Sequence, residues 1–92
     1  MRDTALTMFA LDRVYAERRR QDQLKAEGRF TATLADDGLA DAERLAVIME
    51  EVGEAATDVM TGQNQDGNGQ EGLRKELTQI AALCVAWLER WE

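Results

Sequence analysis

The chain of 92 residues contains no proline and no histidine, one cysteine and five aromatic residues. The absence of proline, together with an apolar set dominated by alanine and leucine, favours helices over a sheet. Without histidine the chain lacks the commonest general base and the imidazole ligands of many metal sites. Any chemistry would therefore depend on carboxylates and a bound metal ion.

The single cysteine, Cys84, excludes an internal disulfide. It stands in an apolar run, which predicts a buried and unreactive thiol. No stretch approaches the roughly 20 apolar residues of a membrane span, and no signal peptide opens the chain. We therefore expect a cytoplasmic protein that does not bind membranes.

The net charge is −7, so a nucleic-acid polymer is not an expected partner for this chain. An acidic protein that binds a polyanionic nucleotide would need a cation between the two. The length predicts a single domain over residues 1–92, whose small buried core would give only marginal stability without help from a partner.

Three segments have the composition and hydrophobic period of α-helices. They are expected at about Thr4–Glu27, from Leu39–Ala42 to Gly62, and from about Leu73 to the C-terminus, with a loop over residues 63–72. Gly28 and Gly62 provide stop signals, and Asp41 is a plausible N-cap of the second helix.

The second and third helices both carry extensive apolar surface. The second has a stripe of helical period formed by Leu45, Ile48, Met49, Val52, Ala56 and Val59. The third has no formal charge from Leu77 to Leu88, and Trp87 and Trp91 add large side chains. A bundle of three helices cannot easily bury so much apolar surface. We therefore expect an all-α antiparallel bundle whose four-helix-type core is completed by dimerisation.

Acidic residues are concentrated in the second helix, where Glu50, Glu51 and Glu54 have no lysine or arginine near them between residues 49 and 70. Side chains three positions apart share one face of a helix. If the helices meet, Glu51 and Glu54 would therefore face Glu76 and Gln79. Such oxygen clusters bind magnesium, which in turn binds phosphates. The alternative is that these acids form only a solvated helix face.

The residues around these acids strengthen the metal-site interpretation. Residues 50–55, followed by 73–80, resemble the E-E-x-x-E … E-x-x-D signature of the MazG-like all-α nucleotide pyrophosphohydrolases. The similarity covers about residues 12–90 and resembles small phage-type or prophage-type members. For Glu50 the resemblance implies a role in orienting or deprotonating the attacking water. It implies metal ligands at Glu51, Glu54, Glu76 and Gln79.

The resemblance implies magnesium-dependent hydrolysis of a nucleoside or deoxynucleoside triphosphate to the monophosphate and pyrophosphate, with manganese as the alternative ion. It also implies a homo-oligomer, at least a dimer. Substrate contacts are expected at Lys75, Arg20 and Gln21. Gln79 departs from the signature, which has Asp there; an amide oxygen can bind a metal but brings no charge. A second interpretation is therefore a relative that binds nucleotides without cleaving them.

A third class of function is compatible with the sequence: a helical interaction protein that dimerises and whose acids are only solvated. Calcium binding is not expected. Residues 64–69 imitate the start of an EF-hand loop, but Lys75 occupies the twelfth position, where a calcium loop needs Glu.

Overall fold

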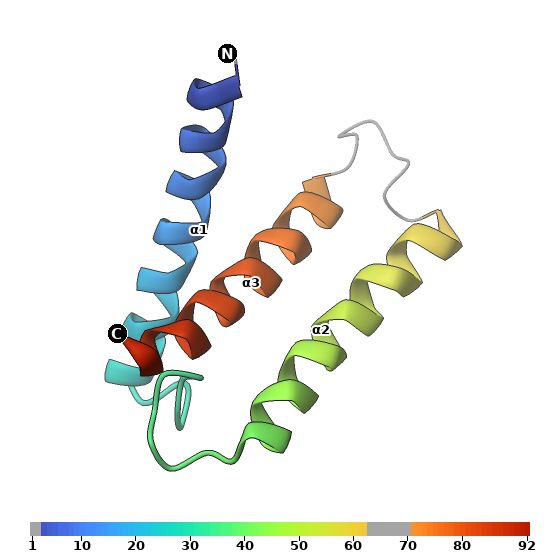
Figure 1. Ribbon diagram of the computed structural model, residues 1–92. Coiled ribbons are helices and arrows are strands. Elements are labelled where there is room, and N and C mark those ends of the chain that lie inside the picture. The colour runs from blue at the N-terminus through green and yellow to red at the C-terminus, as the bar shows by residue number, and fades with distance from the viewer. Residues whose placement is uncertain (1–2, 63–70) are drawn as a thin grey trace.

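The computed structural model describes residues 3–62 and 71–92, and its main elements are three α-helices (Figure 1). They span Asp3–Ala26 (α1), Asp41–Thr61 (α2) and Glu71–Leu88 (α3), and a short 3-10 helix, η1, follows at Glu89–Trp91. No strand occurs in these residues, so the prediction of an all-α chain with three main helices is confirmed. The predicted loop was too long at its end, because residues 71 and 72 already belong to α3; residues 63–70 lie outside the described part.

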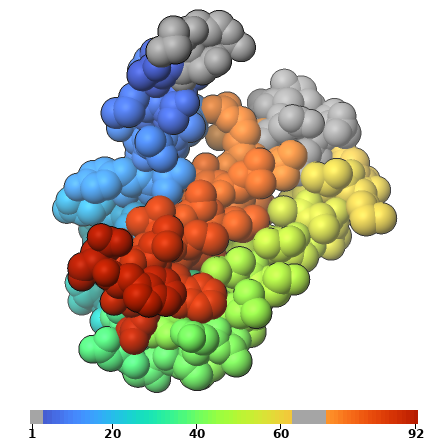
Figure 2. Space-filling view, viewed as in Figure 1, coloured from blue at the N-terminus to red at the C-terminus, as the bar shows by residue number. Residues whose placement is uncertain are grey.

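The central helix is α3, which lies between the other two (Figure 1). It runs antiparallel to α2, whereas α1 crosses it so that the C-terminal ends of α1 and α3 meet. In the described residues no Cα atom of α1 lies within 8 Å of one in α2. The first turns of α1 project beyond α3 (Figure 2), and the side chains of residues 4–13 are all exposed.

The expected glycines end both α1 and α2. Gly28 and Gly62 adopt left-handed backbone with φ of 78° and 75°, a conformation that glycine enters without steric cost. The start of α2 differs from the prediction, since Ala40 rather than Asp41 is the N-cap. The N–H of Ala40 donates to the carboxylate of Glu43 at 2.8 Å. Asp41 is the first helical residue, where its charge is favourable to the helix dipole.

The chain buries few apolar side chains, and the buried ones are mostly small: Leu24, Leu34, Ala55, Ala82 and Ala86. The prediction of a buried Cys84 was wrong, because this residue is exposed. It lies two positions from both Ala82 and Ala86 and thus on the opposite side of α3. In the described part of the chain α1 and α2 are the two long helices that pack against α3, and its apolar run is not buried all round.

The face that α2 turns inward is mixed in character rather than apolar. Its buried and half-buried side chains recur every three or four positions: Arg44, Ile48, Glu51, Ala55 and Asp58. In contrast, Leu45, Met49 and Val59 of the expected apolar stripe are 52%, 57% and 51% exposed. Apart from the half-buried Ile48, the stripe therefore forms an outer surface of the chain, while the carboxylate of Glu51 on the inward face lies close to that of Glu76 on α3.

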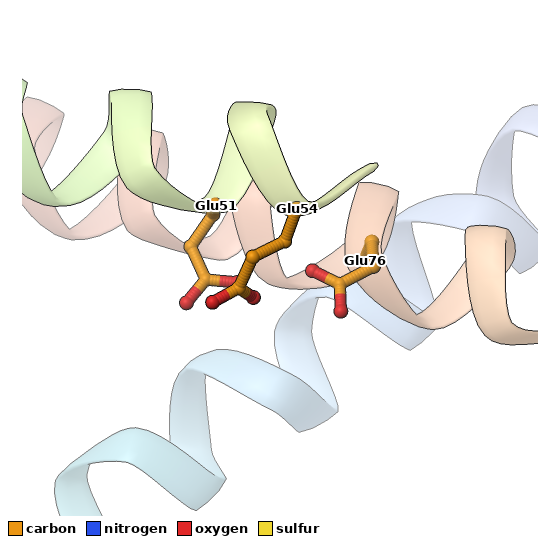
Figure 3. Close-up of side chains that lie close together, drawn as sticks. All are labelled: Glu51, Glu54 and Glu76. Atoms are coloured by element: carbon orange, nitrogen blue, oxygen red, sulfur yellow. The ribbon is translucent and has the colours of Figure 1, made fainter. Parts of the chain in front are cut away.

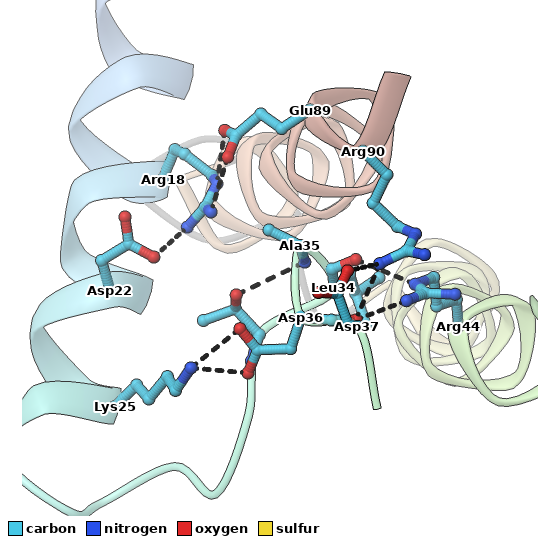
Figure 4. A network of polar contacts seen from close by, with 11 residues as sticks. Arg18, Asp22, Lys25, Leu34, Ala35, Asp36, Asp37, Arg44, Glu89 and Arg90 are labelled. Atoms are coloured by element: carbon cyan, nitrogen blue, oxygen red, sulfur yellow. Dashed lines mark hydrogen bonds and ion pairs between the residues drawn. The ribbon is translucent and has the colours of Figure 1, made fainter. Parts of the chain in front are cut away.

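Cationic side chains hold the connection between α1 and α2 in place (Figure 4). Arg44 is only 1% exposed, and its guanidinium donates to the carbonyl oxygens of Leu34, at 2.9 Å, and of Asp36. Arg90 of η1 donates to the same Asp36 carbonyl at 3.1 Å. Lys25 of α1 donates to the Asp36 carboxylate at 2.8 Å. Side chains of α1, α2 and η1 thus all contribute to fixing this segment.

Among residues 3–62 and 71–92, none of the helices combines the length and the apolar character that a membrane crossing requires.

We expect Arg44→Met to lower the free energy of unfolding by about 1–3 kcal/mol, because the buried Leu34 carbonyl loses its donor and the Asp36 carbonyl keeps only Arg90, while the volume is kept. Urea unfolding followed by circular dichroism measures the change. Arg19→Met is the matched control, since Arg19 is exposed and its removal should cost about 0.5 kcal/mol or less. Equal losses in the two variants would contradict the assigned role of Arg44.

Candidate functional site

Three glutamates from two helices converge where α2 meets α3 (Figure 3). Glu51 and Glu54 belong to α2 and Glu76 to α3, and one carboxylate oxygen of each lies within 4.8 Å of the other two. Glu51 and Glu76 are half-buried, whereas Glu54 is exposed. The two helices therefore bring these side chains close enough to share a single cation.

Two oxygens of this carboxylate cluster (Glu51, Glu54 and Glu76) lack a hydrogen-bond partner among the described residues. They are Oε2 of Glu51 and Oε2 of Glu76, and both are buried. Burial, joined by the neighbouring carboxyl groups of Glu76 and Glu54, raises the pKa of Glu51 to about 7. At an effective dielectric constant of about 20, two ionised carboxylates no more than 4.8 Å apart repel each other by at least about 3 kcal/mol. A cation among them would replace this repulsion by attraction and satisfy both buried oxygens.

Buried charges elsewhere in the described chain have partners within it. Arg18 is 6% exposed and donates to both carboxylate oxygens of Glu89, at 2.8 and 2.9 Å, and to Asp22 at 2.6 Å. Arg44 donates to two carbonyl oxygens of the α1–α2 connection. The contrast shows that the carboxylate cluster is a site where the chain brings charged groups together without supplying the opposite charge.

A cleft of about 500 Å³ lies beside the cluster, lined by residues of all three helices and of the α1–α2 connection. Glu51 belongs both to this cleft and to the cluster, and Gln79 lines the cleft from α3. Half of the remaining lining residues are apolar, namely Phe30, Ala32, Leu34, Leu39, Val47 and Leu83. The cleft therefore joins an apolar chamber to a set of carboxylates.

Gln21 gives the cleft a specific polar feature. Gln21 lines the cleft and is only 4% exposed. Its Oε1 atom is buried and has no hydrogen-bond partner among the described residues. Arg20 and Arg29 line the same cleft, and Phe30 offers a partly exposed aromatic ring. A ligand with a flat, apolar body and a hydrogen-bond donor at its edge fits such a surface.

The remaining predicted site residues lie outside the carboxylate cluster. Glu50, one turn before Glu54, is exposed and lines neither the 500 Å³ cleft nor the smaller groove between α1 and α3. Lys75 and Arg20 line that smaller groove. Sequence reasoning missed the cleft wall at residues 29–34 because this segment has no periodic pattern. The pair Arg29-Phe30, a cation and an aromatic after a helix-ending glycine, was the available signal.

No protein-family model, curated protein or solved structure matches this chain. The similarity to the MazG-like pyrophosphohydrolases therefore remains a prediction from the sequence motif. The case for a function depends on the geometry of the cluster and its cleft.

The raised pKa of Glu51 predicts how metal-free stability changes with pH. The folded chain holds a proton on Glu51 at pH values between the ordinary pKa of 4.5 and about 7, where the unfolded chain has released it. The protonated Glu51 therefore contributes fully to the free energy of unfolding below about pH 4.5. This contribution falls as the pH rises and is lost once the pH has passed about 7.

In EDTA, we therefore expect the wild type to lose more stability between about pH 5.5 and pH 8 than Glu51→Gln does. Urea unfolding at both pH values measures the difference. Asp12→Asn, which changes an exposed carboxyl group of α1, should behave like the wild type. Identical pH profiles for the wild type and Glu51→Gln would rule out the proposed titration.

Proposed function

We propose that this protein is a magnesium-dependent pyrophosphohydrolase that converts a ribo- or deoxyribonucleoside triphosphate to the monophosphate and pyrophosphate. The observation that carries this proposal is the convergence of Glu51, Glu54 and Glu76, with two buried oxygens that lack a partner. All of these ligands are hard oxygens, which suit Mg²⁺ or Mn²⁺ rather than soft metals. The sequence motif supports the same activity.

The cleft beside the cluster supports a nucleotide as the substrate. Its apolar walls and the unpartnered Oε1 of Gln21 suit a nucleobase, which is flat and carries donors at its edge. Glu51 lies in the same cleft, so a ligand whose base occupies the cleft would bring its phosphates toward the carboxylates. Beside three carboxylates, phosphates at that position require an intervening cation.

Each site residue has a role in this reaction. Glu51, Glu54 and Glu76 would hold the ion, and Gln79 would offer its amide oxygen. When bound, magnesium supplies neutralisation of the phosphate charge and a lower pKa for a bound water. Hydrolysis joins the water oxygen to the α-phosphorus and breaks the bond from that phosphorus to the oxygen shared with the β-phosphorus. Glu50 would orient the attacking water or accept its proton.

Glu54→Gln and Glu76→Gln should each reduce magnesium-dependent pyrophosphate release by at least about 100-fold, since even residues behind metal ligands contribute 10–100-fold. Both variants should remain folded by circular dichroism, because they remove a repulsive charge. A coupled pyrophosphate assay over the common nucleotides measures the loss, with Asp12→Asn as the control. Undiminished turnover in both variants would refute the metal-site assignment.

A second function is favoured by a different observation, the large exposed apolar side chains. On α1 they are Leu6, Met8, Phe9, Leu11 and Tyr15, between 53% and 63% exposed. On α2 the apolar stripe is also exposed. Met8, Leu11 and Tyr15 are spaced three and four positions apart and therefore share one face of α1, and an exposed apolar face of this kind marks an interaction site. A non-catalytic helical dimer that serves as an interaction protein is therefore the alternative.

Thermal unfolding with magnesium and a non-hydrolysable nucleoside triphosphate separates these functions. A pyrophosphohydrolase should be stabilised by about 2.7 kcal/mol when the ligand is at 100 times its dissociation constant. An interaction protein should show no shift. A relative that binds nucleotides without cleaving them would show the shift but release no pyrophosphate.

For either function we infer a dimer in which a second copy covers the apolar stripe of α2 and completes a four-helix core. Met49→Glu would place a charge in that interface, and we expect it to convert dimers to monomers in sedimentation velocity runs. The control is Thr57→Glu, which adds the same charge to an exposed position of α2 away from the stripe. A monomeric wild type would contradict this inference.

A further inference from the structure

A second groove, of about 330 Å³, lies between α1 and the first turns of α3. Four cationic side chains line it, against the two acids Glu17 and Glu71: they are Arg13, Arg20, Arg74 and Lys75. The whole chain has only 11 lysines and arginines and a net charge of −7. A groove with an excess of positive charge in such a chain is a local attractor for anions.

Two of these cations are positioned by acids on their own helix. Arg20 donates to both carboxylate oxygens of Glu17, at 2.8 and 2.9 Å, and Arg74 donates to Glu71 at 3.2 Å. In the described residues no ion pair involves Lys75 or Arg13. The groove therefore combines two oriented guanidinium groups with two cations whose charge is available to a ligand.

The groove is continuous with the candidate site. Glu17 and Arg20 line both the groove and the 500 Å³ cleft, so this ion pair forms the wall that the two share. On α3, Lys75 of the groove directly precedes Glu76 of the carboxylate cluster. The cationic groove and the carboxylates thus occupy adjacent faces of one helical turn.

We propose that this groove binds the terminal phosphates of the substrate and then the pyrophosphate product; this rests on the proposed function and makes it more specific. Only phosphates beyond the α-phosphate would reach the groove, so its charge selects triphosphates over monophosphates. Arginine presents a fork of donors to phosphate oxygens, and lysine adds a mobile point charge.

Isothermal titration of the whole protein with inorganic pyrophosphate tests the groove directly, first in EDTA and then with magnesium. We expect Lys75→Gln and Arg13→Gln each to weaken pyrophosphate binding by about 10-fold, because each removes a charged hydrogen-bond donor. The matched control Arg19→Gln removes an exposed cation of α1 that lines neither cleft, and should stay within about twofold of the wild type. Wild-type affinity should rise from phosphate to pyrophosphate to inorganic triphosphate.

Equal affinities of Lys75→Gln, Arg13→Gln and Arg19→Gln would overturn the proposal, as would a wild type that binds no pyrophosphate under either condition. Failure of the proposed function gives a different result. If no nucleotide is hydrolysed but the two groove variants lose pyrophosphate binding, the anion site stands without the enzyme. If nucleotides are hydrolysed while pyrophosphate binding is insensitive to both variants, the enzyme stands without this site.

Discussion

The inward face of α2 carries charged side chains, and the way in which each charge is compensated shapes the structure around it. Arg44 donates to carbonyl oxygens of the preceding connection, which fixes that segment between α1 and α2. Glu51 and Glu76 lie close together with buried oxygens that no group in residues 3–62 and 71–92 satisfies. We infer that an ion from solution completes this contact, so that metal binding and fold stability are linked.

The orientation of α2 also explains the exposed apolar surface. A helix can turn only one face toward a single neighbour, and here that face holds Arg44, Glu51 and Ala55. Leu45 and Met49 of the apolar stripe are consequently left outside. The same rotation that gathers the carboxylates thus creates the surface that a second copy would cover. Such a copy would lie on a different face of α2 from Glu54 and would leave the cluster accessible.

The sequence was sufficient for the helices, because period, glycine stops and the lack of proline are local signals. It also indicated which acids share a helix face, and the structure brings Glu51, Glu54 and Glu76 together. It did not reveal which face of α2 turns inward, since periodicity carries no information about the neighbouring helix. The exposure of Cys84 and the burial of Arg44 were missed for the same reason. Both depend on contacts with segments distant in the sequence, such as the Leu34 carbonyl that Arg44 reaches.

The net charge of −7 does not argue against a polyphosphate ligand, because charges in water act over short distances. At physiological ionic strength the screening length is about 8 Å, so most surface acids contribute little to the potential within a cleft. What a phosphate group would meet is the local set of charges. The groove between α1 and α3 provides four cations against two acids, and the carboxylate cluster would become attractive to phosphates once it holds a divalent ion. The surface would then be acidic except at two places with local positive charge, the groove and the metal-loaded cluster. Such a surface would keep the chain soluble and direct polyanions to those two places.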